Sequence, residues 1–146
     1  RIVMQGITGV NEKIRLKMTI LSKGIFCGNS ANYILIKDNQ YDKKYVLGVL
    51  NSKLLNWYFK LFSTNSNVNG YEVDNLPIPS HDRNSRELVS LVENVLHITK
   101  DEDYLSNPTK QARVKELERQ IDQMVYELYG LTAEEIAVVE GNSEHS

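Results

Sequence analysis

The sequence predicts an α+β domain: a small, twisted, mostly antiparallel sheet with packed helices, followed by a C-terminal helical appendage. Three observations carry this prediction. Apolar and polar residues alternate in the first part of the chain, apolar residues recur at helical spacing from residue 43 onward, and two prolines separate the two parts. We expect residues 1–80 to form one domain and residues 81–146 a helical region.

The strand pattern is clearest over residues 13–20. One set of side chains alternates with another and is predicted on the opposite face of a sheet: Ile14, Leu16, Met18 and Ile20 against Lys13, Arg15, Lys17 and Thr19. Residues 25–27 begin a further strand, and residues 32–36 predict a short buried one. A strand pattern already opens at Ile2, so we expect a fragment of a longer protein.

Residues 43–62 change to a helical period, in which Ser52 caps a second helix. The polar segment 63–70 predicts a loop. Residues 71–79 predict an extended run that ends in Pro77 and Pro79, because proline is excluded from the interior of a helix. We expect this proline segment to act as a hinge.

The remainder of the chain predicts helices. Residues 88–98 form one amphipathic helix, and Asn107 followed by Pro108 opens the next. The apolar residues of this next helix follow a heptad-like seam: Val114, Leu117, Ile121, Met124 and Leu128. Gly130 ends the helix, and a capping box at Thr132 opens a last short helix.

Charge is distributed unevenly along the chain. The 17 basic and 19 acidic residues give a net charge of −2, but residues 1–60 carry +7 and residues 61–146 carry −9. With 41% hydrophobic residues the chain is not disordered, and it has no apolar run near the roughly 18 residues of a membrane span. A single cysteine excludes an internal disulfide. We expect no signal peptide and a cytoplasmic location.

The basic part offers one candidate binding surface. Lys13, Arg15 and Lys17 share a predicted strand face, and a stripe of cations suits phosphates because neutralising them releases counterions. We add Lys23 and Lys60 as further phosphate contacts. The alternative is an ordinary solvated sheet face, and the +7 balance makes the two interpretations about equal.

Polar loops offer a second candidate. Asparagine amides make paired hydrogen bonds to adenine, and short polar groups reach phosphates. The predicted base or backbone contacts are Asn29, Ser30, Asn65, Ser66 and Asn67. The alternative, that these residues only make turns, is favoured by the residue types alone.

Aromatic and titratable residues carry weaker signals. Five aromatic residues are expected to pack in the core: Trp57, Tyr58, Phe59, Phe62 and Tyr71. Of these, Tyr58 or Phe59 could face outward and stack on a base. The histidines do not have metal-ligand spacing: His81, His97 and His145. We therefore predict no metal site and no catalytic residue in this chain.

Three segments together resemble a known family. They are residues 24–35, the run LGVLNSKLLNWYF at residues 47–59, and LPIP at residues 76–79. In this order they resemble the TaqI-like C-terminal specificity domain of adenine-N6 DNA methyltransferases, found in single-chain type IIG restriction–modification enzymes of prokaryotes. The resemblance covers about residues 1–80, and residues 125–132 are similar to the helical end that often follows. It also implies that the first part of the specificity domain is missing, since the chain starts at Arg1.

The resemblance implies that the chain reads a specific sequence in double-stranded DNA and positions it for catalytic domains elsewhere in the parent. It implies no catalysis here, since the methyltransferase motif Asn-Pro-Pro-aromatic is absent, Asn107-Pro108-Thr109 does not match it, and the nuclease pattern PD-(D/E)xK is absent. The parent is then an adenine-N6 methyltransferase, with or without endonuclease activity, that binds S-adenosylmethionine outside this chain. The acidic helices are expected to pack on each other and on the parent's other domains. The alternative function is a helical interaction module in which the seam mediates self-association and DNA contact is incidental.

Overall fold

The computed structural model describes residues 2–6, 8, 11–21, 31–36, 41–64, 66–80 and 85–141. Three antiparallel strands form one sheet with the order β2-β1-β3: β1 (Ile2–Gln5), β2 (Met18–Ile20) and β3 (Ala31–Ile34). The helices follow: α1 (Lys43–Leu50), α2 (Lys53–Phe62), α3 (Gly70–Asp74), α4 (Ser85–Thr99), the 3-10 turn η1 (Tyr104–Ser106), α5 (Pro108–Leu128) and α6 (Ala133–Glu140). The predicted α+β class with a helical C-terminal part is confirmed.

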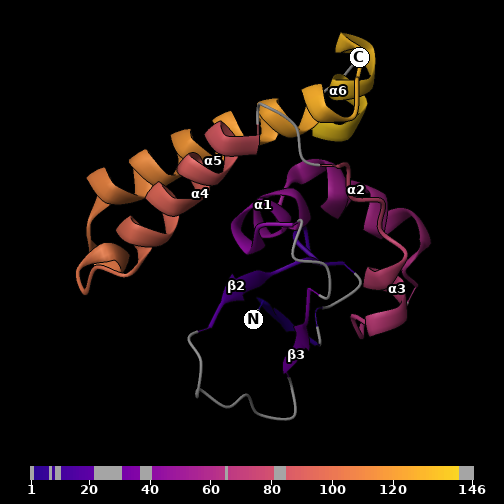
Figure 1. Ribbon diagram of the computed structural model, residues 1–146, viewed down its shortest axis with the longest axis horizontal. Helices are drawn as coiled ribbons and strands as arrows, with labels where there is room; N and C mark the ends of the chain where they lie inside the picture. The colour runs from indigo at the N-terminus through magenta and orange to yellow at the C-terminus, as the bar shows by residue number, and fades with distance from the viewer. Residues whose placement is uncertain are drawn as a thin grey trace.

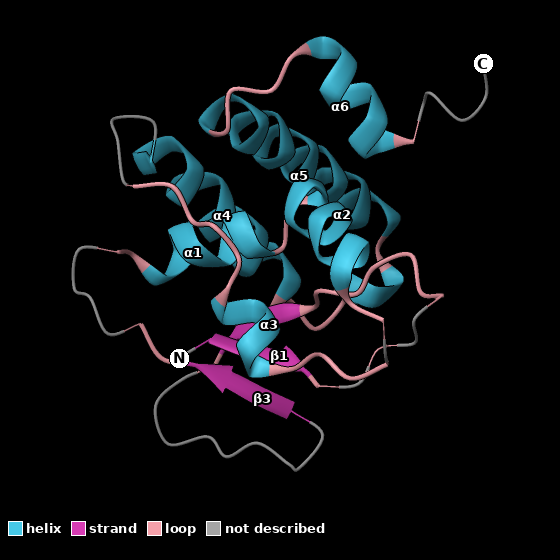
Figure 2. Ribbon diagram, turned by 90° about the vertical axis from the view of Figure 1, so that its right-hand side faces the viewer, coloured by secondary structure: helices cyan, strands magenta, loops and turns pink. Residues whose placement is uncertain are grey.

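The helices lie in two groups. Figure 2 shows α1 and α2 on one side of the sheet. Figure 1 shows α4 and α5 as a long hairpin that lies against α1 and extends beyond the sheet. The central strand β1 is covered well enough that Ile2, Val3 and Met4 are all buried. The edge strand β3 is less well covered. It confirms the strand predicted near residues 32–36, but its Tyr33 is 54% exposed, so the predicted burial of that strand is wrong.

Helix ends follow the sequence signals closely. Ser52 accepts a hydrogen bond from the main-chain N–H of Leu55, and Asn107 accepts one from Lys110 with Pro108 in the first turn. Thr132 forms the predicted capping box with Glu135. The left-handed region at Gly130 (φ 67°) follows the end of α5. These local predictions are confirmed because the groups that cap a helix are only three or four residues apart.

Two predicted strands differ from the structure. Residues 13–17 are not part of the sheet, and β2 contains only Met18–Ile20. In place of the predicted extended run from residue 71, Gly70–Asp74 form α3, since the Glu72 carboxylate accepts a hydrogen bond from the main-chain N–H of Asn69. The pattern Asn69-x-x-Glu72 is a capping signal that the sequence contains and the prediction overlooked. The strand predicted at residues 25–27 lies outside the described residues.

Within the described residues, one hydrophobic core contains side chains from both parts of the chain. Ile2 of β1, Leu50 of α1, Leu88 of α4 and Val125 of α5 all belong to it. The seam of α5 is used within the chain, because α5 lies against α4 and its residues Val114, Leu117 and Ile121 are buried. The acidic hairpin therefore packs on the chain's own α1. The division of the chain into domains at residue 80 stays a prediction.

The proline segment is held by hydrogen bonds to its main-chain carbonyls. The hydroxyl of Tyr45 in α1 donates to Pro79 O at 2.8 Å. The hydroxyl of Tyr129, just after α5, donates to Pro77 O. Proline lacks an N–H, so these carbonyls are the only main-chain hydrogen-bonding groups that the two prolines offer. The two tyrosines thus tie the segment between the sheet-bearing part and α4 to both neighbouring helices.

Gly48 in α1 allows the close approach of α1 and α4. A Cβ at this position would lie 2.8 Å from Cγ2 of Val92 and 3.6 Å from Cδ1 of Leu88. We expect Gly48→Ala to lower the free energy of unfolding by about 1 to 2 kcal/mol, because overpacking outweighs the better helix propensity of alanine. Urea unfolding followed by circular dichroism measures this. The control is Gly70→Ala, where the new Cβ meets nothing within 4 Å; an equal loss in both variants would contradict the steric explanation.

Candidate functional site

The predicted contact residues fall into three groups. Lys13, Lys17 and Lys60 are exposed, as are Ser66 and Asn67. Arg15 is buried. The remaining predicted contacts lie outside the described residues: Lys23, Asn29, Ser30 and Asn65.

Arg15 does not share an exposed face with Lys13 and Lys17, and that prediction is wrong. Its side chain is 1% exposed, whereas Ile14, predicted on the buried face, is 52% exposed. The guanidinium lies 5.3 Å from the centre of the Phe59 ring, its Nε donates to Thr8 Oγ1 at 2.8 Å, and its Nη2 donates to Ser63 Oγ at 3.4 Å. Arg15 therefore holds residues 8 and 63 together beneath the surface and is not placed to contact a phosphate.

The loop that contains Ser66 and Asn67 lies beside the end of β1. The main-chain N–H of Thr8 donates to Ser66 O at 2.7 Å, and that of Val68 donates to Gly6 O at 2.8 Å. The Asn32 amide of β3 donates to Val68 O at 3.3 Å. Because Val68 is buried, the loop is fixed from below while its two predicted contact residues stay at the surface.

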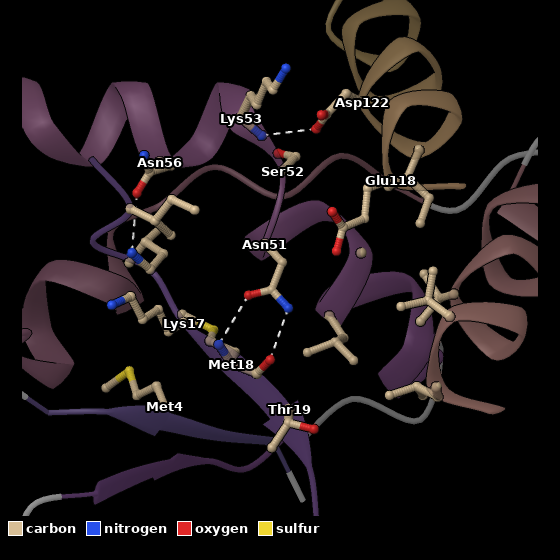
Figure 3. A pocket seen from close by; sticks show the side chains of 18 of the residues that line it. Met4, Lys17, Met18, Thr19, Asn51, Ser52, Lys53, Asn56, Glu118 and Asp122 are labelled. Atoms are coloured by element: carbon tan, nitrogen blue, oxygen red, sulfur yellow. Dashed lines mark hydrogen bonds between the residues drawn. The ribbon is translucent and has the colours of Figure 1, made fainter. Parts of the chain in front are cut away.

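Two asparagines that the sequence analysis did not select fix the segment between Lys13 and Met18. The Asn56 side chain accepts the main-chain N–H groups of Arg15 (2.7 Å) and Leu16 (3.1 Å) and donates to Lys13 O at 2.9 Å. The Asn51 side chain accepts from Met18 N and donates to Met18 O, at 3.1 and 2.9 Å (Figure 3). The Asn51 side chain thus takes both main-chain hydrogen bonds that a neighbouring strand would make with Met18 on the outer edge of β2. No further strand can pair with β2 at Met18.

This arrangement explains the run at residues 47–59. Its apolar residues, such as Leu55 and Phe59, are buried in the core, Ser52 caps α2, and the two asparagines bind the segment that carries Lys13 and Lys17. The only signal in the sequence is that Asn56 interrupts an apolar helical run. A polar residue in such a place indicates a hydrogen-bonding partner, but nothing local shows which one.

A mostly apolar groove of about 750 Å³ runs between β2, α1 and the α4–α5 hairpin (Figure 3). At its rim the buried carboxylate of Asp122 in α5 accepts the main-chain N–H of Lys53, the first residue of α2, at 2.9 Å. Burial raises the pKa of Asp122 to about 6, against the lowering effect of the Lys53 N–H and ammonium. Burial also raises the pKa of the neighbouring Glu118. Asp122 therefore links the hairpin to the N-terminus of α2 at a cost in desolvation.

The raised pKa of Asp122 is expected to make the stability of the protein depend on pH. Its pKa in the folded protein lies above the value of roughly 3.9 in an unfolded chain, so the folded state binds this proton more tightly and loses stability as pH rises from about 4 to 6. Asp122→Asn keeps an acceptor for the Lys53 N–H without the charge. We expect the variant to be more stable than the parent at pH 7 by about 1 to 2 kcal/mol, a gain that shrinks towards pH 4.

Urea unfolding at pH 4, 5, 6 and 7 gives the difference in unfolding free energy between the two proteins at each pH. The contributions of the other carboxylates are the same in both proteins and cancel in this difference. The exposed Asp74 provides the control variant, Asp74→Asn. A difference that stayed constant over this range would contradict the assignment to Asp122.

The aromatic residues divide between core and surface. Phe59 is fully buried, as core packing predicts, and Tyr58, the other residue named as able to face outward, is 40% exposed. Phe62 and Tyr71 are also exposed, so the prediction of core packing is wrong for these two residues. Within the described residues no group of three or more His, Cys, Asp or Glu side chains has a geometry that would hold a metal ion. None of the described helices is long and apolar enough to cross a membrane.

These observations define an α+β domain. Its sheet-bearing part carries exposed lysines and a polar loop, and the α4–α5 hairpin packs against α1. The sequence model of the family described as the TaqI-like C-terminal specificity domain matches residues 1–78. The chain belongs to this family. Membership implies recognition of a DNA target in a type II restriction–modification enzyme. No curated protein matches the chain.

Proposed function

We propose that this chain reads a specific sequence in double-stranded DNA and positions that site for catalytic domains of the same parent protein. Membership in the specificity-domain family is the observation that carries the proposal. The parent is an adenine-N6 DNA methyltransferase, with or without endonuclease activity. Its methyl donor, S-adenosylmethionine, binds in the catalytic part, and the proposal gives none of the described residues a catalytic role.

The proposed DNA-binding surface consists of Lys13, Lys17, Lys60, Ser66 and Asn67. The lysines are exposed, and the main chain around Lys13 and Lys17 is fixed by Asn56 and by the hydrogen bond from Gln5 N to Lys17 O at 3.0 Å. A fixed main chain keeps the entropy cost of ordering these side chains on a phosphate backbone low. Arg15 supports this surface from beneath. Lys23, Asn29, Ser30 and Asn65 remain proposed contacts.

The lysines would supply affinity, and the loop would supply sequence preference. Phosphate contacts set the salt dependence of binding, whereas contacts to base edges discriminate between sequences. Ser66 and Asn67 are held at the end of β1 by main-chain hydrogen bonds, so their position does not depend on the DNA. The helical part is assigned no DNA contact, because residues 61–146 together carry a net charge of −9, which repels phosphates.

Selection from a random pool of duplexes, followed by fluorescence anisotropy with the selected duplex, tests the proposal. We expect the chain to enrich one short sequence motif. We expect Lys13→Glu with Lys17→Glu to weaken binding at least tenfold at low salt and to reduce the slope of affinity against salt by about two. The matched control is Lys100→Glu with Lys115→Glu, which makes the same charge change at exposed positions of the helical part.

Two results would contradict the proposal. Binding without enrichment of any motif would remove the sequence-reading role. Equal losses in the two double variants would show that net charge, and not the surface around Lys13 and Lys17, controls binding.

A further inference from the structure

A small pocket opens on the surface between α2 and α3. It has a volume of about 350 Å³ and six lining residues: Tyr58, Phe62, Thr64, Tyr71, Glu72 and Asn75. We call it the aromatic pocket. Residues 58 and 62 are one helical turn apart on α2, and Lys60, two residues from each, points to the opposite side of that helix. The aromatic pocket therefore faces away from Lys60, while Thr64, which lines it, lies two residues before Ser66 of the proposed DNA-binding surface.

Three aromatic rings are accessible in the aromatic pocket. Tyr71 is 66% exposed, and Tyr58 and Phe62 are each about 40% exposed. The rings of Tyr58 and Phe62 meet edge to face with centres 5.5 Å apart, and Phe62 makes a second such contact with the buried Phe59 at 5.4 Å. These contacts hold Phe62 in place from below. The accessible ring faces carry negative electrostatic potential, which attracts cations.

Two residues of the aromatic pocket, Glu72 and Asn75, offer acceptor oxygens. Glu72 is buried, and its Oε1 accepts from the main-chain N–H and the side-chain amide of Asn69 at 3.2 and 2.9 Å. No described residue donates a hydrogen bond to its other carboxylate oxygen. The Asn75 amide donates to Tyr71 O at 2.7 Å, and no described residue donates to its side-chain oxygen. The exposed Asp74 adds a second negative charge on α3.

We propose that the aromatic pocket binds an arginine side chain presented by a partner protein. A guanidinium is flat enough to stack on a ring and carries five N–H donors, which match the acceptor atoms of Glu72 and Asn75. The charge of Glu72 and Asp74 favours a cation and repels the phosphates that flank any nucleobase. The pocket has the volume for one side-chain head group. This inference does not depend on DNA binding by the other surface.

Titration of the full chain with N-acetyl-arginine amide, followed by NMR, tests the inference. The expected result is that resonances of Tyr58, Phe62 and Tyr71 shift and saturate at millimolar concentrations. N-acetyl-citrulline amide has the same shape without the charge and is expected to bind about fivefold more weakly or worse. Tyr71→Ala and Glu72→Gln should each weaken arginine binding to a similar extent, whereas Tyr71→Phe should retain it.

The control variant is Leu61→Ala, since Leu61 is 64% exposed on α2 but does not line the aromatic pocket. Tyr71 is exposed, so Tyr71→Ala is expected to fold normally, which the remaining resonances check. Equal binding of the arginine and citrulline compounds would overturn the inference. So would a DNA duplex shifting the three aromatic resonances while the arginine compound does not, because the pocket would then stack a base. If the Lys13→Glu, Lys17→Glu variant loses DNA binding but still binds the arginine compound, that result supports an arginine site that is independent of DNA binding.

Discussion

Arg15→Ala is expected to lower the free energy of unfolding by about 3 kcal/mol, one of the two largest losses among the single substitutions predicted for this chain. The substitution removes a side chain that is 1% exposed and lies over Phe59, and it deprives the hydroxyls of Thr8 and Ser63 of a donor. The aliphatic stem of the arginine contributes packing as well as charge. Chemical denaturation monitored by tryptophan fluorescence measures the loss.

Lys13→Ala is the matched control for Arg15→Ala. Both residues are basic and lie two positions apart, but Lys13 is exposed, so its replacement should change stability by no more than about 0.5 kcal/mol. The two variants should therefore separate two roles, with Arg15→Ala affecting folding and Lys13→Ala affecting DNA affinity at full stability. Similar stabilities for the two variants would mean that Arg15 is not part of the interior.

Asn56→Ala is expected to lower the free energy of unfolding by about 3 kcal/mol, as much as Arg15→Ala but for a different reason. The main-chain N–H groups of Arg15 and Leu16 lose their acceptor, and Lys13 O loses a donor. Part-buried main-chain groups without partners are expensive because they have given up water. Urea unfolding reports the stability, and hydrogen exchange at Arg15 and Leu16 reports the local change.

Two further variants make the Asn56 prediction specific. Asn56→Asp keeps an acceptor for both N–H groups but not the donor to Lys13 O, so its loss should be smaller than that of Asn56→Ala. Asn94→Ala removes an exposed asparagine from α4 and should be nearly neutral. Fast exchange at Arg15 and Leu16 in the unmodified chain would contradict the geometry on which the prediction rests.

Sequence patterns predicted the parts of this fold that depend on neighbours in the chain. Ser52, Asn107, Thr132 and Gly130 mark helix ends as expected, since a cap and its target are a few residues apart. The helical period in α5 likewise places its apolar residues on one face, where Val114, Leu117 and Ile121 are buried and Met124 and Leu128 are half-buried. The α+β class and the family followed from these patterns and from the run at residues 47–59.

The candidate site was predicted less well, because it depends on contacts between distant segments. Alternation over residues 13–20 correctly separates Leu16 from Lys17 but fails at Ile14 and Arg15, where the chain leaves the sheet to meet Asn56, about 40 residues away. No local period records such a contact. The exposure of Phe62 and Tyr71 could not be predicted from local patterns either, since it depends on how α3 packs beside α2.

The attachment of the loop at Ser66 has a consequence for how recognition can change during evolution. The loop is joined to the end of β1 through Ser66 O and Val68 N, which are main-chain atoms that nearly every residue type possesses. Substitution of the exposed side chain at position 66 therefore leaves that attachment intact. If this loop reads bases, a new sequence preference can arise there by single replacements that keep the attachment, while Arg15, which binds Thr8 at that attachment, must stay as it is.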